Sequence, residues 1–266
     1  MMINKLLMII LIAVCSANVY GQKSVSENSR DFYQIKIYHL KSKAQEDAMD
    51  NYLKNAYLPA LHKLGIQHVG VFKPVKDSAD TKNYDVTIYV FIPFSNTNAF
   101  FQLDKNLSAD KEYLEKAESY INANYDATPY ERYESVLLSA FPKNLHYKLP
   151  VLKGPKKDRV YELRSYEGPT EKYFKNKVNM FNDGNEVSIF KRLNFNAVFY
   201  ASVVSGSHMP NLMYLTTFEN KQDREEHWKT FGNDSEWKAL LAQPKYAHNV
   251  SHADILFLFP ADYSDI

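Results

Sequence analysis

Three things are scarce in this sequence of 266 residues, and each scarcity excludes a class of chemistry. There is a single cysteine, Cys15, so any disulfide or catalytic thiol depends on that residue. There are only 8 glycines and no G-x-G-x-x-G, P-loop or G-x-S-x-G pattern, which argues against nucleotide binding and serine-hydrolase chemistry. Excess charge is also missing: 32 basic and 31 acidic residues argue against nucleic acid or an anionic membrane as a partner.

Long apolar runs are confined to the N-terminus. The sequence MMINKLLMIILIAVCSANVYGQ has a basic residue, an apolar stretch over 6–14 and then small residues, which is typical of a secretory signal peptide. We expect residues 1–21 to be removed and the chain to be exported, to the periplasm or the medium. Val14 is bulky for a lipoprotein signal, so anchoring through Cys15 is not expected. No later run is long enough to cross a bilayer.

Apolar periodicity predicts the same order of elements, β-α-β-β-α-β, in each half of the chain. In the first half (30–142), the predicted strands are 32–40, 66–75, 84–94 and 135–142, and the predicted helices are 43–64 and 96–123. In the second half (159–266), they are 159–166, 195–206, 212–219 and 254–260, with helices at 169–183 and 221–231 and a helical pattern around Trp237. The segment 143–158, which contains Pro150 and Pro155, is the predicted linker.

This order predicts an α+β fold of two tandem ferredoxin-like units. A ferredoxin-like sheet carries helices on one face only, so its other face needs a cover. The simplest cover is the sheet of the other unit. We therefore expect a pseudo-dimeric α/β barrel with the two sheets facing each other around a lumen.

Four segments of the second half resemble the NIPSNAP family of the dimeric α/β-barrel superfamily. They are YELRSY (161–166), FENKQDREEHW (218–228), NDSEWKALL (233–241) and LFPADYS (258–264), and together they cover about 159–266. Ser235 stands where the family usually has proline, and the first half matches only in element order and in YQIKIY. Relatives in the superfamily include cofactor-free monooxygenases, haem-degrading enzymes, peroxidases and mutarotases. The resemblance thus implies a fold without selecting one function.

The segment VYELRSY (160–166) alternates between apolar and polar side chains. If its apolar positions face the helices, Glu162, Arg164 and Tyr166 point into the lumen. There they could bind a ligand and transfer protons, as catalytic residues. The alternative is that Glu162 and Arg164 form a structural ion pair between the two sheets.

The segment FYQIKIY (32–38) has the same pattern, so Gln34, Lys36 and Tyr38 are predicted to bind ligand from the other wall of the lumen. His208, in the loop SGSHMP, is predicted at the pocket mouth. His248 and His252 are four apart but lie outside a helical pattern, and no H-E-x-x-H motif occurs, so no metal site is expected.

Our leading hypothesis is an exported protein that binds a small organic molecule in the barrel lumen. An enzyme of this kind would be a cofactor-independent oxygenase or isomerase, because acid and base groups are present and cofactor motifs are not. The alternatives are a non-catalytic interaction module, including a homodimer held by the charged strand faces, and a haem-handling protein with a histidine ligand. An open lumen favours ligand binding, and a lumen filled by side chains argues against it.

Overall fold

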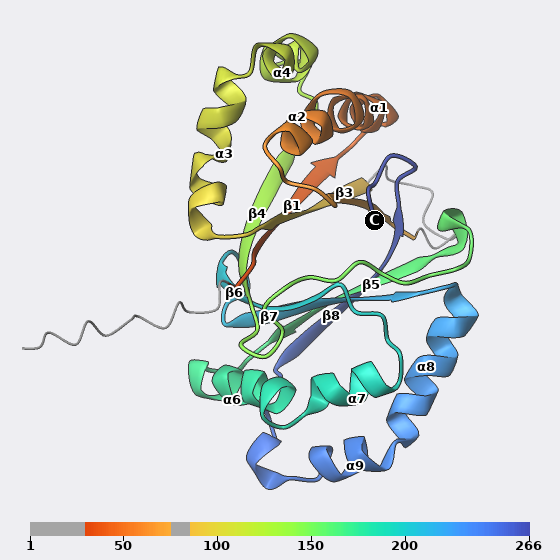
Figure 1. The fold of residues 1–266 in the computed structure, drawn as a ribbon. Helices are drawn as coiled ribbons and strands as arrows, with labels where there is room; N and C mark the ends of the chain where they lie inside the picture. Colours follow the sequence, from red (N-terminus) through yellow and green to blue (C-terminus); the bar gives the residue numbers. More distant parts are fainter. Residues whose placement is uncertain (1–29, 76–85) are drawn as a thin grey trace, which may run out of the picture.

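The computed structural model describes residues 30–75 and 86–266 (Figure 1). The predicted signal peptide lies outside these residues. Within the described ranges, no helix has both the length and the apolarity needed to cross a membrane.

The first half follows the predicted order of elements. Its strands are β1 (Phe32–Leu40), β2 (Gly70–Pro74), β3 (Val86–Phe94) and β4 (Arg132–Ala140). The segment between β1 and β2 consists of α1 (Lys43–Tyr52), a π-helical turn (Leu53–Tyr57) and α2 (Leu58–Lys63). Between β3 and β4 lie α3 (Thr97–Ala109), α4 (Lys111–Lys116) and α5 (Glu118–Ile121). The predicted strand at 66–75 is shorter than expected, and His68 before it has a positive φ of 62°.

The second half repeats the order with one helix that periodicity did not predict. Its strands are β5 (Val160–Glu167), β6 (Phe199–Ser205), β7 (Asn211–Phe218) and β8 (His252–Pro260). Helices α6 (Glu171–Asn182) and α7 (Glu186–Arg192) precede β6, while α8 (Lys221–Asn233) and α9 (Ser235–Leu241) precede β8. Short 3₁₀ turns lie at Lys156–Asp158 and Pro244–Tyr246. The unpredicted helix is α7, which follows Asn185 in a left-handed conformation and is only two turns long.

The eight described strands form one closed antiparallel barrel in the order β1-β3-β2-β8-β5-β7-β6-β4. The two halves join at β2–β8, where Lys73 lies opposite Phe259, and at β4–β6, where Leu138 lies opposite Val203. Helices of the first half cover one side of the barrel and helices of the second half cover the other (Figure 1). The structure thus confirms a mixed α/β fold built around a barrel.

The centre of the barrel is filled by aromatic and aliphatic side chains from both halves. The rings of Tyr33, Phe91 and Phe199 pack with centroid separations of 5.2 to 5.3 Å. At the end near these rings, Tyr147 from the linker and the C-terminal Ile266 pack against the same cluster. Most of the expected lumen is therefore side-chain core, and this end of it is closed.

We expect Phe91→Ala to lower the free energy of unfolding by about 3–5 kcal/mol, because the side chain is buried among rings from both halves and its loss leaves a cavity. Phe101→Ala is the matched control, since Phe101 is 69% exposed. Denaturant titrations of both variants measure the difference. Equal stabilities would contradict a barrel core shared by the two halves.

Candidate functional site at one end of the barrel

The polar strand face of β5 points away from the barrel interior, opposite to the predicted direction. Tyr161 and Leu163 belong to the cluster inside the barrel. Glu162 lies against α8, where it contacts Arg224 and Trp228. The prediction that Glu162, Arg164 and Tyr166 enter the lumen is therefore wrong about their direction.

Gln34, Lys36 and Tyr38 of β1 also point away from the barrel interior, opposite to the prediction. Gln34 donates a hydrogen bond of 2.7 Å from Nε2 to Ser135 Oγ on the outer face of β4. Lys36 Nζ lies 5.2 Å from the centre of the Tyr57 ring in the helical layer. Tyr38 is buried in the cluster that joins the helices of the first half to the sheet. The lumen placement of Gln34, Lys36 and Tyr38 is also wrong, because the apolar alternate positions fill the narrow interior instead.

Glu162 is the centre of a buried ionic cluster between sheet and helices. Its carboxylate is fully buried and accepts hydrogen bonds from Arg164 Nε, from Arg224 Nε at 2.7 Å and from Trp228 Nε1 at 2.9 Å. The Arg164 guanidinium also lies 3.6 Å from the centre of the Trp228 ring, in a cation–π contact. One buried carboxylate is thus surrounded by two cations and an indole N–H, which compensate its desolvation.

The cluster continues through hydrogen bonds along the same layer. Arg164 Nη1 donates to Tyr166 Oη at 2.9 Å, and Tyr166 Oη lies 2.8 Å from Tyr214 Oη. Lys177 Nζ forms a buried ion pair of 2.9 Å with Glu186. Burial raises the pKa of the Glu186 carboxyl, although Lys177 opposes the shift, and burial also raises the pKa of the Tyr214 hydroxyl. These groups bind one another, which favours a structural role, but between sheet and helices rather than between two sheets.

An open pocket of about 260 Å³ lies at the other end of the barrel interior from Tyr147 and Ile266. Its apolar wall includes Ile35 and Ile37 of β1, Val136 of β4, Leu163 of β5, Met213 of β7 and Leu256 of β8. Its volume is slightly below the range of about 300–1,000 Å³ that is common for small-molecule sites. The lumen is therefore filled at its centre and open at one end.

The inward faces of five strands change from apolar to polar at this end. Antiparallel pairing brings the last residues of β1 and β5 beside the first residues of β4, β7 and β8. Strand alternation then places polar residues inward at the rim. These residues include His39 on β1, Arg132 and Glu134 on β4, Ser165 and Glu167 on β5, Asn211 on β7, and His252 and Asp254 on β8.

The rim is a ring of paired imidazoles and carboxylates. The pairs are His39 Nε2 with Glu134 Oε1 at 2.7 Å, His208 Nδ1 with Glu167 Oε1 at 3.0 Å, and His252 Nε2 with Asp254 Oδ1 at 3.0 Å. Deeper in the pocket, Asn211 Nδ2 donates to Ser165 Oγ at 2.8 Å, and both residues are buried. The pocket therefore offers hydrogen-bonding and proton-transfer groups above an apolar floor.

Of the predicted site residues, His208 lies at this rim, in the loop between β6 and β7. Its backbone is left-handed, with φ of 59°. The predicted set did not include Glu134, Glu167 or Asp254. Their signal was present in the sequence as polar residues at the ends of otherwise apolar alternate positions. It could be recognised only after the inward face of each strand was known.

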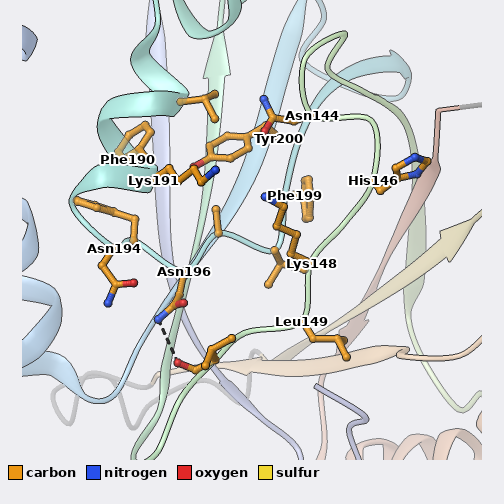
Figure 2. Close-up of a pocket in the computed structure, with 15 residues that line it drawn as sticks. Asn144, His146, Lys148, Leu149, Phe190, Lys191, Asn194, Asn196, Phe199 and Tyr200 are labelled. Carbon is orange, nitrogen blue, oxygen red and sulfur yellow. Dashed lines mark hydrogen bonds between the residues drawn. The ribbon is translucent and has the colours of Figure 1, made fainter. Parts of the chain in front are cut away.

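A second, smaller cavity lies between the linker and α7 (Figure 2). Its volume is about 190 Å³, and its walls come from 144–151, from α7 and from 194–200. Asn196 Nδ2 bridges two of these walls by donating to the Val151 carbonyl at 3.3 Å. His146 lies at the edge of this cavity, and its imidazole contacts Asp31 of another segment. The barrel end brings together more acid and base groups, so it is the stronger candidate.

Comparison with known proteins agrees with the resemblance seen in the second half. Residues 161–265 match the NIPSNAP family. This region contains the whole Glu162 cluster, whereas the barrel-end pocket also uses β1, β3 and β4, which lie outside the NIPSNAP match. No curated protein matches the chain.

Solved structures extend the likeness to nearly the whole barrel. A proposed monooxygenase from Lactobacillus acidophilus NCFM is 11% identical, with a TM-score of 0.54 over 87% of this chain and 94% of that one. One from Fusobacterium nucleatum is 10% identical, with a TM-score of 0.51 over 87% and 93%. A NIPSNAP family protein from Agrobacterium tumefaciens is 19% identical, with a TM-score of 0.35 over 40% and 96%. At these identities the two full-length matches support the fold alone.

We expect Glu162→Gln to lower the free energy of unfolding by about 3–5 kcal/mol, because it leaves Arg164 and Arg224 without their carboxylate, and Arg164→Met to lower it less, because Glu162 keeps Arg224. Asp47→Asn, which removes the partner of Lys43 in an exposed pair, is the control and should leave stability unchanged. Denaturant unfolding measures all three. Wild-type stability in both buried variants would contradict a structural role for the cluster.

Proposed function

We propose that the protein binds a small organic molecule in the barrel-end pocket. One observation carries the proposal: five strands turn polar at the same end, around a cavity of about 260 Å³ with an apolar floor. Such a pocket suits a ligand with one or two rings or a short aliphatic body and a polar end. The body would lie against Ile35, Val136 and Leu163, and the polar end would meet the rim.

The charges at the rim narrow the class of ligand. Glu134 and Asp254 line the pocket, Glu167 lies beside them, and no lysine or arginine is among the described residues that line it. Like charges repel strongly near a partly desolvated surface. The pocket therefore favours a neutral or cationic ligand with hydrogen-bond donors, such as a hydroxylated ring or an amine, over a carboxylate.

Proton transfer is the reaction step that the rim supports best. Glu134 and His208 line the pocket, and His39 Nε2 lies 2.7 Å from Glu134 Oε1, so a carboxylate and imidazoles at the rim could exchange a proton with a bound molecule. This arrangement suits an isomerase or a cofactor-independent oxygenase, in both of which a base takes a proton from the substrate. The small volume argues against a macrocycle such as haem.

A non-catalytic interaction module is the second candidate function. It is favoured by Ile255, Phe257 and Phe259, which are 42%, 37% and 38% exposed on the outer face of β8. If the protein is such a module, the pocket has no ligand, and substitutions that line the pocket leave binding of the partner protein unaltered. The barrel closes within one chain, so the pocket itself does not require a homodimer.

The proposal includes a tandem architecture. In each half the strand order across the sheet places the first strand centrally, as β4-β1-β3-β2 and as β8-β5-β7-β6. This order and the β-α-β-β-α-β succession support two ferredoxin-like units that form a pseudo-dimeric barrel. The two walls of the pocket then come from different units.

We expect the wild-type protein to bind 2-naphthol more tightly than 2-naphthoate, since the two probes share a ring system and differ in charge. Ile37→Trp, which fills the pocket, should weaken 2-naphthol binding at least about tenfold, or 1.4 kcal/mol. Ile255→Trp adds the same bulk on the outer face of β8 and should bind normally. Titration of probe fluorescence measures the affinities. Tighter naphthoate binding, or equal 2-naphthol binding by both variants, would refute the pocket.

Export is a separate part of the proposal and rests on the N-terminal sequence. Expression of the full chain in a bacterial host should yield a protein that lacks residues 1–21 outside the cytoplasm. Intact mass and N-terminal sequencing of the periplasmic and culture fractions measure the cleavage site. An uncleaved protein confined to the cytoplasm would be evidence against export.

A further inference from the structure

Glu167, His252 and Asp254 converge at the barrel rim although Glu167 is 85 residues away from His252 in the chain. Pairing of β5 with β8 places Glu167 opposite His252 and Ser165 opposite Asp254. The three residues therefore lie on the same inward face of adjacent strands. Their ligand-type atoms all lie within 4.8 Å of one another. Among the described residues, this is the one such group of three.

A fourth group of ligand type lies beside these three. His208 Nδ1 is 3.0 Å from Glu167 Oε1, and His252 Nε2 is 3.0 Å from Asp254 Oδ1. Ligand atoms that share one divalent ion at about 2.1 Å are themselves separated by roughly 3.0–3.5 Å, and these two spacings lie in that range. Exposed His252 and Asp254 can rotate to close the remaining distance.

Glu167 is the least exposed of the four side chains. Its Oε1 atom is buried and has no hydrogen bond of good geometry, although the imidazole of His208 is near. This carboxylate oxygen faces the imidazole at 3.0 Å without an aligned donor, and a cation bound by both groups would compensate its burial. Other histidine–carboxylate pairs, such as His146 with Asp31, bring together only two groups of this kind.

We propose that Glu167, His208, His252 and Asp254 form a binding site for one divalent transition-metal ion at the rim of the pocket. Two imidazoles with two carboxylates suit Zn²⁺, Mn²⁺, Fe²⁺, Co²⁺ or Ni²⁺, whereas Mg²⁺ and Ca²⁺ prefer oxygen ligands alone. Four protein ligands would complete a tetrahedral Zn²⁺ site, whereas a six-coordinate ion such as Mn²⁺ would keep two further positions. A hydroxyl of a molecule in the pocket could occupy such a position.

Isothermal titration of the tag-free full-length protein, stripped with chelator, with Zn²⁺ and separately with Mn²⁺ tests the site. We expect one ion per chain, and much weaker binding of Mg²⁺. We expect at least about tenfold weaker Zn²⁺ binding in each of three variants, His252→Ala, Asp254→Asn and Glu167→Gln. Mutation of residues that only hydrogen-bond to metal ligands already lowers metal affinity about tenfold or more. Circular dichroism checks that each variant is folded, and the exposure of His252 and Asp254 makes unfolding unexpected.

His146→Ala is the matched control, since its imidazole is as exposed as that of His252 and also pairs with a carboxylate. It should bind Zn²⁺ like the wild type. Absence of binding at a 1:1 ratio, or equal binding by the control and the three rim variants, would overturn the site. The small-molecule proposal is tested separately: the wild-type protein should still bind 2-naphthol in chelator, and Ile37→Trp should still bind Zn²⁺.

Discussion

Hydrogen bonding between β2 and β8 and between β4 and β6 joins two four-stranded sheets into one closed barrel. Closure leaves no free sheet edge among the described strands and turns one face of every strand inward. The interior is narrow, so apolar rings such as those of Tyr33, Phe91 and Phe199 fill its centre. Polar residues can then face inward only near an end, where water or a ligand reaches them.

Closure also determines where the charged strand face must go. With the interior apolar, Glu162 and Arg164 have to lie under the helices. That layer would be costly for charges if the helices did not carry complementary groups. Arg224 and Trp228 on α8 provide them. Thus the helices of the second half are attached to the sheet by a charged cluster as well as by apolar packing. The first half uses tyrosine rings around Lys36, together with ion pairs from Lys73 on β2 to Glu46 and Asp50 on α1.

The two halves contribute differently to the pocket although they share one order of elements. Glu134 and His39 come from the first half, and Glu167, His208 and Asp254 come from the second. A half alone would present these residues on an open sheet face, without a cavity. The pocket therefore exists only where the two halves close into one barrel. The NIPSNAP match covers one of these halves.

Much of the fold was predictable because strand and helix periods are local properties of the chain. The two β-α-β-β-α-β successions and the strand VYELRSY follow from apolar spacing, and only short α7 was missed. The direction of each strand face was not predictable in this way. Both faces of β5 are buried, so alternation shows two environments without saying which one lies inside the barrel. Apart from His208, the residues of the candidate site were missed for the same reason.

Residue types and their spacing therefore established which segments become strands and helices, and that the strand beginning at Val160 has two unlike faces. Only the closed barrel decided that Tyr161 and Leu163 face inward and that Glu162 pairs with Arg224. It also brought Glu167 to His252 and Asp254. Those outcomes depend on pairing between residues far apart in the chain, and no local pattern contains that information.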